Sequence, residues 1–556
     1  MIGVIADPAE HDVVREFFEL FKTPWEFHRK NQQYDVVICS GNQRPDADAS
    51  LVVVYAGRKM GFDDQAETPV SRRTGAGIVK YRDNRIPIYG ETVAFNGRDT
   101  SGSLLTDENS GQCVAYVDEH AGIRRARIGY DLFDEVRRLL TVGQPPANAD
   151  IPALELHIAF LRNLIVESDL ALVEIPPVPD GFQFIVCLTH DVDHPSIRQH
   201  KWDHTIVGFL LRAIFGSVID AFLGRVSIRD VAKNWAAAIK LPFVYMDLAK
   251  DFWRDFDDRY MELEKGLPST FFVIPRKGYP GKHAGGSAPA LRAAHYEAQE
   301  LTDTICKLKG AGCEVGLHGV DAWLNETAAC NELEEIRRLT GGSEIGVRMH
   351  WLYYDNKSPV ALDEAGAAYD STIGYNETVG FRAGTTQVYK PLEAEQLLEL
   401  PMHAMDTAMF YPAYLGLSAR EAKVLLDSMV DNAVQFGGCL TVNWHDRSTA
   451  PERLWGGCYR ELIQELKSRM VWFSTGGQAT AWFRKRRSVV FERDRKEPGG
   501  VRSKLPLEHR DDLPGLRLRI YEPRKLDPVN GHLSHDYFDI VVEGDAKASV
   551  RSESRI

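Results

Sequence analysis

The sequence predicts an α/β protein whose largest part is a distorted (β/α)7 barrel, preceded by an α/β domain and followed by a small C-terminal β appendage. Two observations lead to this prediction. Between Phe184 and Phe483, about seven short β-rich runs alternate with helical stretches, and repeated strand–helix units build a parallel sheet. Most of these runs end in polar residues or a turn, as strands of a parallel α/β fold do where chemistry collects.

Residues 1–150 form the first predicted domain. The runs "MIGVIAD", "YDVVICSG" and "LVVVYAG" read as strands, and "DVVREFFELF" between the first two reads as a helix. No phosphate-binding loop or glycine fingerprint occurs there, so a scaffold or a docking role is expected. Residues 151–183, with "PALELHIAFLRNLIVE" and the break "IPPVPDGF", are predicted to be a helical linker.

The barrel, residues 184–483, is predicted from seven runs and the helices between them. Two of these helices are "LRAAHYEAQELTDTICKLKGAG" and "NETAACNELEEIRRLTGG", the second of which ends in glycines as helices do. Residues 484–556 follow as a linker that opens with the basic run "RKRRSVVFERDRK" and an appendage with the strands "LRLRIYEP" and "DYFDIVVEG". The seven runs are "FIVCLTHD", "STFFVIP", "CEVGLHG", "IGVRMHW", "LLELPMHAMD", "CLTVNWHD" and "MVWFSTG".

Composition excludes several classes of protein. Of the 556 residues 44% are hydrophobic and 26% are charged, which is typical of a globular protein. The net charge of −13 argues against a nucleic-acid binder, which needs a basic surface. Eight cysteines without a CxxC pair predict reduced, buried thiols, and the N-terminus lacks a signal pattern, so a cytoplasmic protein is expected.

One long apolar stretch, Ile206–Val226, leaves two alternatives open. Arg212 and Asp220 interrupt it, and a spanning helix would carry each charge in lipid at a cost of about 2.5–3.5 kcal/mol. A surface helix is therefore expected, with its apolar face packed on its own protein or in contact with a membrane interface. The second alternative would favour a lipid-linked substrate.

Carboxylates and imidazoles follow the predicted strands at five places. The carboxyl ends of parallel strands meet at one rim, so these side chains are expected to form an active-site mouth. One Asp, two His and a water are the ligands of a catalytic zinc site, so a divalent metal is predicted: Zn²⁺ first, with Co²⁺, Ni²⁺ or Fe²⁺ as alternatives. The carboxylates and imidazoles are Asp191, Asp193, His318, His350, Asp406, His445 and Asp446, and Arg348 lies at the end of the same run as His350.

The order of these motifs resembles the polysaccharide deacetylase family, the NodB-homology or carbohydrate esterase family 4 group. "THDVD" stands where that family has Thr-Phe-Asp-Asp-Gly, "STFFV" matches its second strand, and "EVGLHG", "VRMHW" and "TVNWHD" resemble its later motifs. "YDSTIGYNETVGFRAGT" is similar to a segment of bacterial members with an extra N-terminal domain. The resemblance covers roughly Phe184–Phe483 and implies a metal-dependent hydrolase of carbon–nitrogen bonds that removes acetyl groups from amino sugars.

The chain departs from the family pattern twice. Val192 separates two Asp residues that are adjacent in the family, and strand alternation puts Asp191 and Asp193 on one face. The resemblance implies that Asp191 is the general base and Asp193 a metal ligand, although the two roles could be exchanged. The second His of the metal motif is replaced by Ala322. His350 is the candidate replacement, with Asp321 as the second choice beside His318 and Asp193.

The resemblance also implies a general acid, His445, that protonates the leaving amine. A carboxylate on its other nitrogen would fix its tautomer, with Asp406 as first choice and Asp370 as second. Candidate substrate-binding residues are Arg348 and Arg382, which could also form structural ion pairs, and Trp351 and Trp444, whose faces suit sugar rings but also fill barrel tops.

The expected function is therefore deacetylation of N-acetylated sugars in surface-polysaccharide metabolism, with a carbohydrate as substrate. A deformylase or cyclic-amide hydrolase on the same fold is one alternative. The other is a catalytically inactive glycan-binding or scaffold protein, which the incomplete metal motif favours. The sequence predicts neither the sugar nor the oligomeric state.

Overall fold

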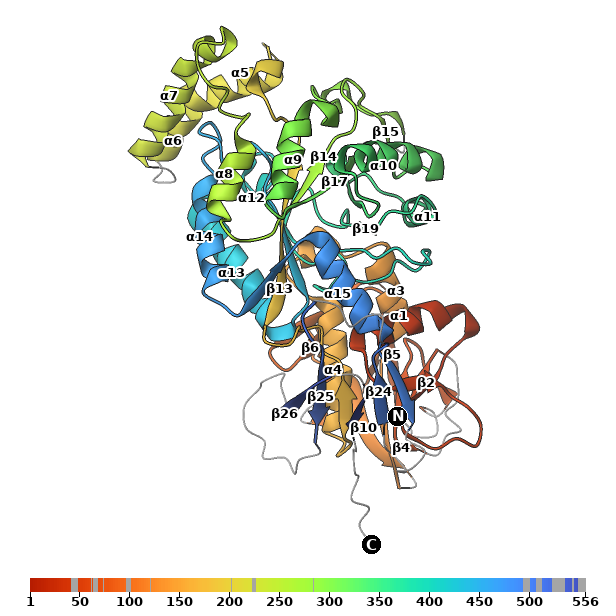
Figure 1. Cartoon of the computed structure of the whole chain (residues 1–556). Coiled ribbons are helices and arrows are strands. Elements are labelled where there is room, and N and C mark those ends of the chain that lie inside the picture. Colours follow the sequence, from red (N-terminus) through yellow and green to blue (C-terminus); the bar gives the residue numbers. More distant parts are fainter. Residues whose placement is uncertain are drawn as a thin grey trace. The chain divides into compact units, whose positions relative to one another are not determined.

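The computed structural model forms two compact units (Figure 1). Unit 1 comprises Met1–Gly181, Arg382–Thr385 and Trp482–Ile556, and unit 2 comprises Phe182–Phe381 and Thr386–Ala481. The structure describes all residues except 42–48, 62, 64–68, 74, 97–101, 121, 202, 223–226, 284, 494–500, 507–512, 523–535, 543–544 and 549–556.

The sheet of unit 2 is parallel throughout. Within the described residues it has eight strands in the order β19-β18-β17-β14-β13-β21-β20, with β22 also pairing with β13. The strands are β13 (Phe184–Val192), β14 (Thr270–Val273), β17 (Glu314–Gly319), β18 (Gly346–Met349), β19 (Tyr369–Asp370), β20 (Ala404–Met405), β21 (Cys439–Asn443) and β22 (Val471–Ser474).

Backbone hydrogen bonds close this sheet into a distorted barrel. The extended segment 398–405 contains β20, which pairs with β21 on one side. On its other side the amide of Leu400 donates to the carbonyl of Asp370 in β19, and the amide of Met402 donates to the carbonyl of Ile373. The segment therefore joins the two ends of the strand order, and the predicted barrel-like α/β fold is confirmed.

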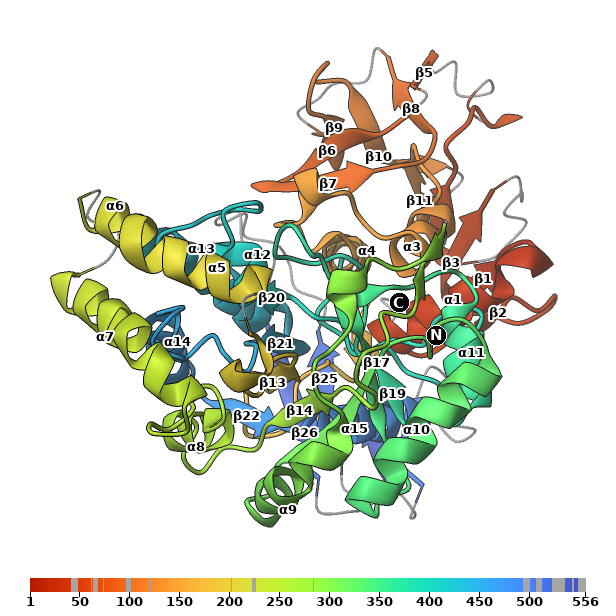
Figure 2. The ribbon, with the colours of Figure 1, turned by 90° about the horizontal axis from the view of Figure 1, so that it is seen from above.

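Burial explains why these runs become strands of a barrel. All nine residues of β13 are buried, as are all residues of β14 and β21. Strands that are covered on both faces read as continuous apolar runs, which is the pattern of parallel sheets. Viewed from above, helices surround these strands on the outside (Figure 2), among them α9 (Thr302–Gly310), α10 (Glu326–Thr340), α13 (Ala419–Phe436) and α14 (Gly456–Lys467).

Local sequence sets the ends of these helices. The side chain of Asn325 caps α10, and Gly341 ends it with a φ of 65°, a conformation that favours glycine. Ser418 and Glu421 form a capping box at the start of α13. The other helices of four residues or more in unit 2 are α5 (His204–Leu211), the π-helix η5 (Arg212–Gly216), α6 (Ser217–Phe222), α7 (Ile228–Tyr245), α8 (Phe256–Leu263), η7 (Ala298–Leu301), α11 (Ser358–Glu364) and α12 (Asp406–Phe410), and α15 (Gly476–Ser488) runs from unit 2 into unit 1.

Unit 1 contains the predicted N-terminal α/β arrangement. The strands β1 (Ile2–Ile5), β3 (Tyr34–Ser40) and β4 (Ala49–Tyr55) are parallel neighbours, and α1 (His11–Phe21) lies between the first two in the chain. α4 (Ala153–Val166), which was expected in a linker, is buried along nearly its whole length and is a core helix of unit 1. The same sheet also holds β2 (Trp25–Phe27), β5 (Val70–Arg73), β6 (Gly77–Tyr81), β7 (Asn84–Ile88), β8 (Thr92–Phe95), β9 (Leu105–Asp107), β10 (Cys113–His120) and β11 (Ile123–Ile128), and α3 (Leu132–Thr141) follows.

The C-terminal segment adds the expected β structure. The two predicted strands, β25 (Arg517–Tyr521) and β26 (Tyr537–Val541), pair antiparallel, and β25 also pairs with β12 (Leu172–Glu174). A second sheet consists of β23 (Val490–Arg493), β24 (Val501–Lys504) and β27 (Asp545–Ala548). The last three residues of the basic run, 494–496, lie outside the described residues.

Unit 2 differs from the sequence-based expectation in two places. The sequence did not predict β19, which has only two residues. The helix expected over residues 291–312 is wrong in its first half, because α9 covers only Thr302–Gly310. Tertiary contacts override the helical pattern there: the guanidinium of Arg292 is buried and donates to the carbonyls of Val320 and His350.

The apolar stretch Ile206–Val226 becomes α5, η5 and α6, and residues 223–226 lie outside the described part. Together with α7 these elements form a helical hairpin, described over residues 204–222 and 227–245, whose two arms lie side by side in both views (Figures 1 and 2). No helix in the described part of the chain is both long and apolar enough to cross a membrane.

Candidate functional site

A cavity of about 410 Å³ opens where the barrel strands end. Residues at or just after the ends of β13, β14, β17, β18, β20 and β21 line it, so the strand ends meet at one rim as expected for a parallel barrel. Six of these residues are Asp193, Ile274, His318, His350, Met405 and His445.

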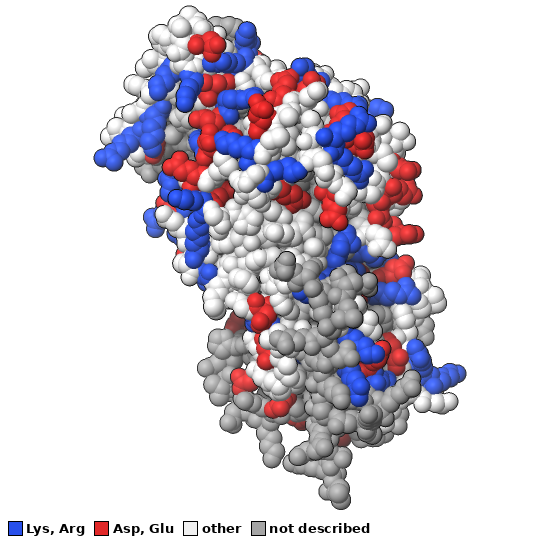
Figure 3. Space-filling model, viewed as in Figure 1, with Lys and Arg blue, Asp and Glu red and all other residues white. Residues whose placement is uncertain are grey.

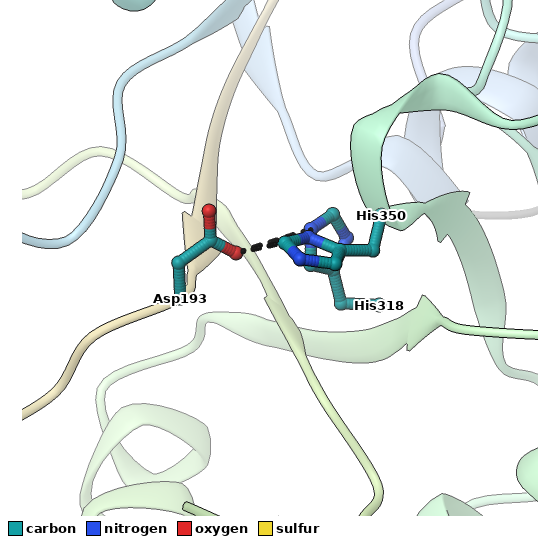
Figure 4. Close-up of side chains that lie close together, drawn as sticks. All are labelled: Asp193, His318 and His350. Atoms are coloured by element: carbon teal, nitrogen blue, oxygen red, sulfur yellow. Dashed lines mark hydrogen bonds and ion pairs between the residues drawn. The ribbon is translucent and has the colours of Figure 1, made fainter. Parts of the chain in front are cut away.

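Three of the predicted residues come together in this cavity (Figure 4). Asp193 follows β13, His318 lies in β17 and His350 follows β18. Oδ1 of Asp193 lies 3.3 Å from Nε2 of His318 and 3.4 Å from Nδ1 of His350, and the two nitrogens are 3.0 Å apart. These are the side chains that were expected to form a metal site, including the candidate replacement for the missing second His.

Backbone carbonyls indicate the tautomers of the two imidazoles. Nδ1 of His318 lies 3.0 Å from the carbonyl oxygen of Arg348, and Nε2 of His350 lies 3.2 Å from the carbonyl oxygen of Arg292. A carbonyl only accepts, so each of these nitrogens carries the proton and donates. The opposite nitrogens, Nε2 of His318 and Nδ1 of His350, then present lone pairs to each other and to Asp193.

This arrangement fits a divalent cation. With the proton on the carbonyl side of each ring, three lone-pair atoms face one another, which is unfavourable unless a cation lies among them. Oδ1 of Asp193 is buried and has no hydrogen-bond donor within the described residues. Ligands of a tetrahedral site with bond lengths of about 2.0–2.2 Å are about 3.3–3.6 Å apart, close to the three distances observed.

The charges around Asp193 favour its ionised form. Burial by itself raises the pKa of a carboxyl group, but positive charge on His350 and His318 in the metal-free protein outweighs burial and holds the pKa of Asp193 well below its usual range. Burial also lowers the pKa of His350, which keeps the ring neutral and able to donate a lone pair. An ionised carboxylate and neutral imidazoles are the forms in which such side chains bind a metal.

Asp191 has different surroundings from Asp193, although both face the cavity. Its Oδ1 accepts a hydrogen bond from Arg348 (3.1 Å), and its Oδ2 accepts one from Nδ2 of Asn443 (2.8 Å). Burial opposes ionisation of Asp191, yet His318, Arg348 and His445 together lower its pKa. Asp191 is thus a fixed carboxylate whose oxygens are already held by donors.

His445 forms a dyad with Asp406 on the opposite side of Asp193. Nδ1 of His445 lies 2.6 Å from Oδ1 of Asp406, and the amide of His445 donates to Oδ2 of the same carboxylate. Nε2 of His445 points to the cavity, 3.8 Å from Oδ2 of Asp193. Burial lowers the pKa of His445, but Asp406, Asp193 and Asp191 outweigh burial and raise the pKa to about 10.

Aromatic and basic side chains line the outer part of the cavity. Trp351 lines it as predicted, and Tyr353, Tyr411 and Trp455 add further ring faces. Arg453 is held over the rings of Tyr411 and Trp455. Apart from Trp351, these residues lie in loops after the strands, where no strand pattern could point to them. Such a wall suits the faces and hydroxyl groups of a sugar.

Three predicted substrate-binding residues do not line this cavity. Arg348 is fully buried and donates to Asp191, Thr189 and Ser371, so it orients a carboxylate and cannot reach a substrate. Trp444 is fully buried, with its ring against Tyr459. Since side chains alternate along a strand, Trp444 faces outward between two inward-facing residues.

The third, Arg382, belongs to unit 1, where its carbonyl accepts a hydrogen bond from the amide of Gln144. Two alternatives from the sequence are also placed elsewhere. Asp321 accepts hydrogen bonds from Tyr279 and from the amide of Lys282, and Asp370 accepts one from Thr372. Asp321, the second choice as metal ligand, and Asp370, the second choice as partner of His445, are not among the described residues that line the cavity.

A second group of metal-ligating side chains, His200, Asp203 and His295, lies close together. Both ring nitrogens of His200 already have partners: Nδ1 is 2.6 Å from Asp203 and Nε2 is 3.2 Å from Nδ1 of His194. Nδ1 of His295 in turn lies 3.0 Å from the carbonyl oxygen of Gln199, so the polar atoms of this group already have partners in the protein.

Comparisons with known proteins give low similarities. No family model and no curated protein matches the chain. Among solved structures, a probable polysaccharide deacetylase from Pseudomonas aeruginosa PAO1 is 15% identical, with a TM-score of 0.35, and covers 56% of this chain and 94% of its own. An allantoinase is also 15% identical (TM-score 0.32; 55% and 91%), and a family 4 acetyl xylan esterase from Clostridium thermocellum, in complex with a cobalt ion, is 14% identical (TM-score 0.24; 54% and 91%).

Proposed function

We propose that unit 2 is a divergent polysaccharide deacetylase: a divalent-metal hydrolase that removes acetyl groups from N-acetylated sugars. The observation that carries the proposal is the convergence of Asp193, His318 and His350 around one buried, unsatisfied carboxylate oxygen, beside Asp191 and His445. A metal ligand set, a fixed carboxylate and a cationic imidazole in one cavity are the parts that hydrolysis of an amide requires.

The three converging side chains would hold the metal, with Zn²⁺ as first choice. A bound divalent metal lowers the pKa of a water molecule and polarises the carbonyl group of a substrate. Asp193 is the better ligand of the two Asp residues, because its Oδ1 lacks a donor, whereas both oxygens of Asp191 are already hydrogen-bonded.

Asp191 would act as the general base. Arg348 and Asn443 fix the orientation of its carboxylate, and its lowered pKa keeps it ionised at neutral pH. A base that is held in place and faces the cavity can take a proton from the attacking water without reorganising.

His445 would act as the general acid. Asp406 holds its Nδ1, so Nε2 carries the transferable proton and points into the cavity. The raised pKa, about 10, keeps the ring protonated before reaction, and donation of that proton to the departing amine completes cleavage of the carbon–nitrogen bond.

The substrate would be a saccharide of surface-polysaccharide metabolism. The rings of Trp351, Tyr411 and Trp455 give the cavity flat apolar faces, and Arg453 adds a fixed donor beside them. Sugar rings bind such walls through their C–H faces and hydroxyl groups. A deformylase or cyclic-amide hydrolase would use the same inner residues and would differ in this outer wall.

The experiment is to incubate the full-length protein and Zn²⁺ or Co²⁺ with N-acetylated oligosaccharides and to measure released acetate. We expect acetate release that falls by about 100-fold or more in Asp191→Asn and in His445→Ala. Asp258→Asn on α8, an exposed carboxylate paired with Lys307, is the matched control and should keep the wild-type rate.

Each other outcome identifies a different function. Release of formate, or opening of a cyclic amide without acetate, would replace the deacetylase with a related carbon–nitrogen hydrolase. Saccharide binding without any hydrolysis, by a protein that holds its metal, would indicate a glycan-binding protein. Acetate release that is equal in wild type and Asp191→Asn would contradict the proposed mechanism.

A further inference from the structure

The helical hairpin, residues 204–245, exposes an apolar surface that the proposed function does not use. Phe215 in η5 and Phe222 in α6 are 60% and 89% exposed. Ile228 and Ile239 in α7 are 83% and 69% exposed. Large side chains of this kind are rarely exposed together on a monomer without a partner.

The exposed residues of α7 form a stripe along one face. At about 100° per residue, Ile228, Ile239 and Met246 at the end of the helix point within about 20° of one direction. The opposite face is buried, with Ala237, Leu241 and Val244 packed in the core of the hairpin. The stripe is therefore additional to the face that folds the hairpin.

Basic residues of α7 lie between the stripe and the buried face. Arg229, Lys233 and Lys240 are about 100° to 140° around the helix from the stripe. Residues 204–250 contain six Lys or Arg and three Asp, although the whole chain has a net charge of −13. Figure 3 shows Lys and Arg side chains, together with a few Asp and Glu side chains, and uncharged surface between them where the hairpin lies.

This combination of residues fits a lipid surface better than a protein surface. Helices that lie in a membrane interface place Trp, Phe and Leu on one face and Lys or Arg beside it. Protein interfaces are depleted in Lys at their centres. Trp235, which is half-exposed, lies on the edge of the stripe and fits the same pattern.

The hairpin is fixed to the wall of the cavity. Nδ2 of Asn234 in α7 donates to the carbonyls of Pro451 and Glu452 (3.3 and 3.0 Å). The next residue, Arg453, lines the cavity. A partner that binds the hairpin would therefore lie close to residues 451–453, which shape the cavity.

We propose that the helical hairpin docks this protein on the surface of an anionic lipid bilayer, with its apolar stripe among the headgroups and its basic residues on anionic lipids. The hairpin lies in the surface and does not span the membrane. This proposal does not depend on the deacetylase function.

The test is sedimentation of the full-length protein with vesicles of phosphatidylcholine, with and without phosphatidylglycerol. The wild type should sediment with the anionic vesicles and far less with the neutral ones. Ile239→Ser should weaken binding about tenfold or more. Arg229→Gln and Lys240→Gln should each weaken it about fivefold.

Matched controls come from helices on the barrel. Val424→Ser on α13 removes an apolar side chain that is 66% exposed, and Lys467→Gln on α14 removes an exposed charge; both should bind as the wild type does. The proposal is overturned if the wild type does not sediment with anionic vesicles, or if Ile239→Ser sediments equally. It is also overturned if the wild type is a dimer in solution that Ile239→Ser converts to a monomer.

Discussion

Asp191 in β13 and Asp193 directly after that strand lie two residues apart, and donors decide which role each can take. Arg348 and Asn443 hold both oxygens of Asp191, while Oδ1 of Asp193 lies beside two imidazole nitrogens and has no hydrogen-bond donor among the described residues. The sequence left these roles exchangeable, because alternation gives two Asp residues on one face and says nothing about partners from other strands.

The Asp406–His445 dyad gives the first prediction. Asp406→Asn removes the charge that raises the pKa of His445, so less of the ring is protonated at neutral pH. Acetate release should fall by about 100-fold near pH 8, and the deficit should shrink as the pH falls because protonation of His445 recovers. The measurement is kcat across the pH range for both proteins.

Equal rates of Asp406→Asn and wild type near pH 8 would contradict the assignment of His445 as the acid. The amide of His445 also donates to Asp406, and an Asn at this position can still accept that bond. If the far-ultraviolet circular dichroism spectrum of the variant matches that of the wild type, the lower rate reflects lost chemistry and not lost structure.

Trp455 gives a second prediction at the same scale. Its ring lines the cavity and is stacked with Phe410, away from the metal-ligating residues. Trp455→Ala should raise KM for the saccharide about tenfold and change kcat little, because stacking binds substrate and transition state alike. Steady-state kinetics decide: a fall in kcat at unchanged KM would place this residue in the chemistry.

At the scale of elements, the closure of the barrel brings two acids together. The backbones of Asp370 in β19 and Glu399 form a bridge, and both side chains are fully buried. Burial raises the pKa of each carboxyl group, and the charge of Asp370 raises that of Glu399 further. The pair therefore favours a bound proton in the folded protein.

This pair predicts how stability depends on pH. A folded-state pKa above the unfolded value gives stability that is present at low pH and lost as the pH rises through the folded pKa. Asp370→Asn should therefore raise the free energy of unfolding, measured by urea denaturation, by on the order of 1–3 kcal/mol at about pH 8 and change it little at about pH 4. An unchanged difference between wild type and variant at both pH values would refute this account.

Strand alternation explains which site residues the sequence could predict. Asp191 and Asp193, at the end of β13, both face the cavity. At the end of β21, Asn443 and His445 also face inward, and Trp444 between them faces outward. The same rule turns His190 away from the cavity, and its Nε2 lies 2.9 Å from Glu264, next to α8. Trp444 was mispredicted because nearness to a motif was given more weight than its alternation.

At the scale of the whole molecule, the sequence predicted the parallel barrel and the N-terminal βαβ arrangement from periodicity alone. It did not predict β19, because two residues give no periodicity, or the part of the cavity wall made by Tyr411 and Arg453, because loops have no repeating pattern. It also took residues 151–183 as a linker, although α4 is almost fully buried in unit 1. A helical pattern in the sequence does not show whether the helix will be buried in the core of a domain.

The central claim is that Asp193, His318 and His350 hold one divalent metal in unit 2. The most direct measurement is the number of zinc equivalents that the chelator-treated, full-length protein takes up, determined by calorimetry and elemental analysis for the wild type and for His350→Ala. His295→Ala, a histidine outside the cavity, is the control. We expect one tight equivalent of zinc in the wild type and in the control, and a loss of about 100-fold or more in zinc affinity in His350→Ala. A wild type that takes up no zinc, or a His350→Ala variant that still binds one equivalent as tightly, would contradict it.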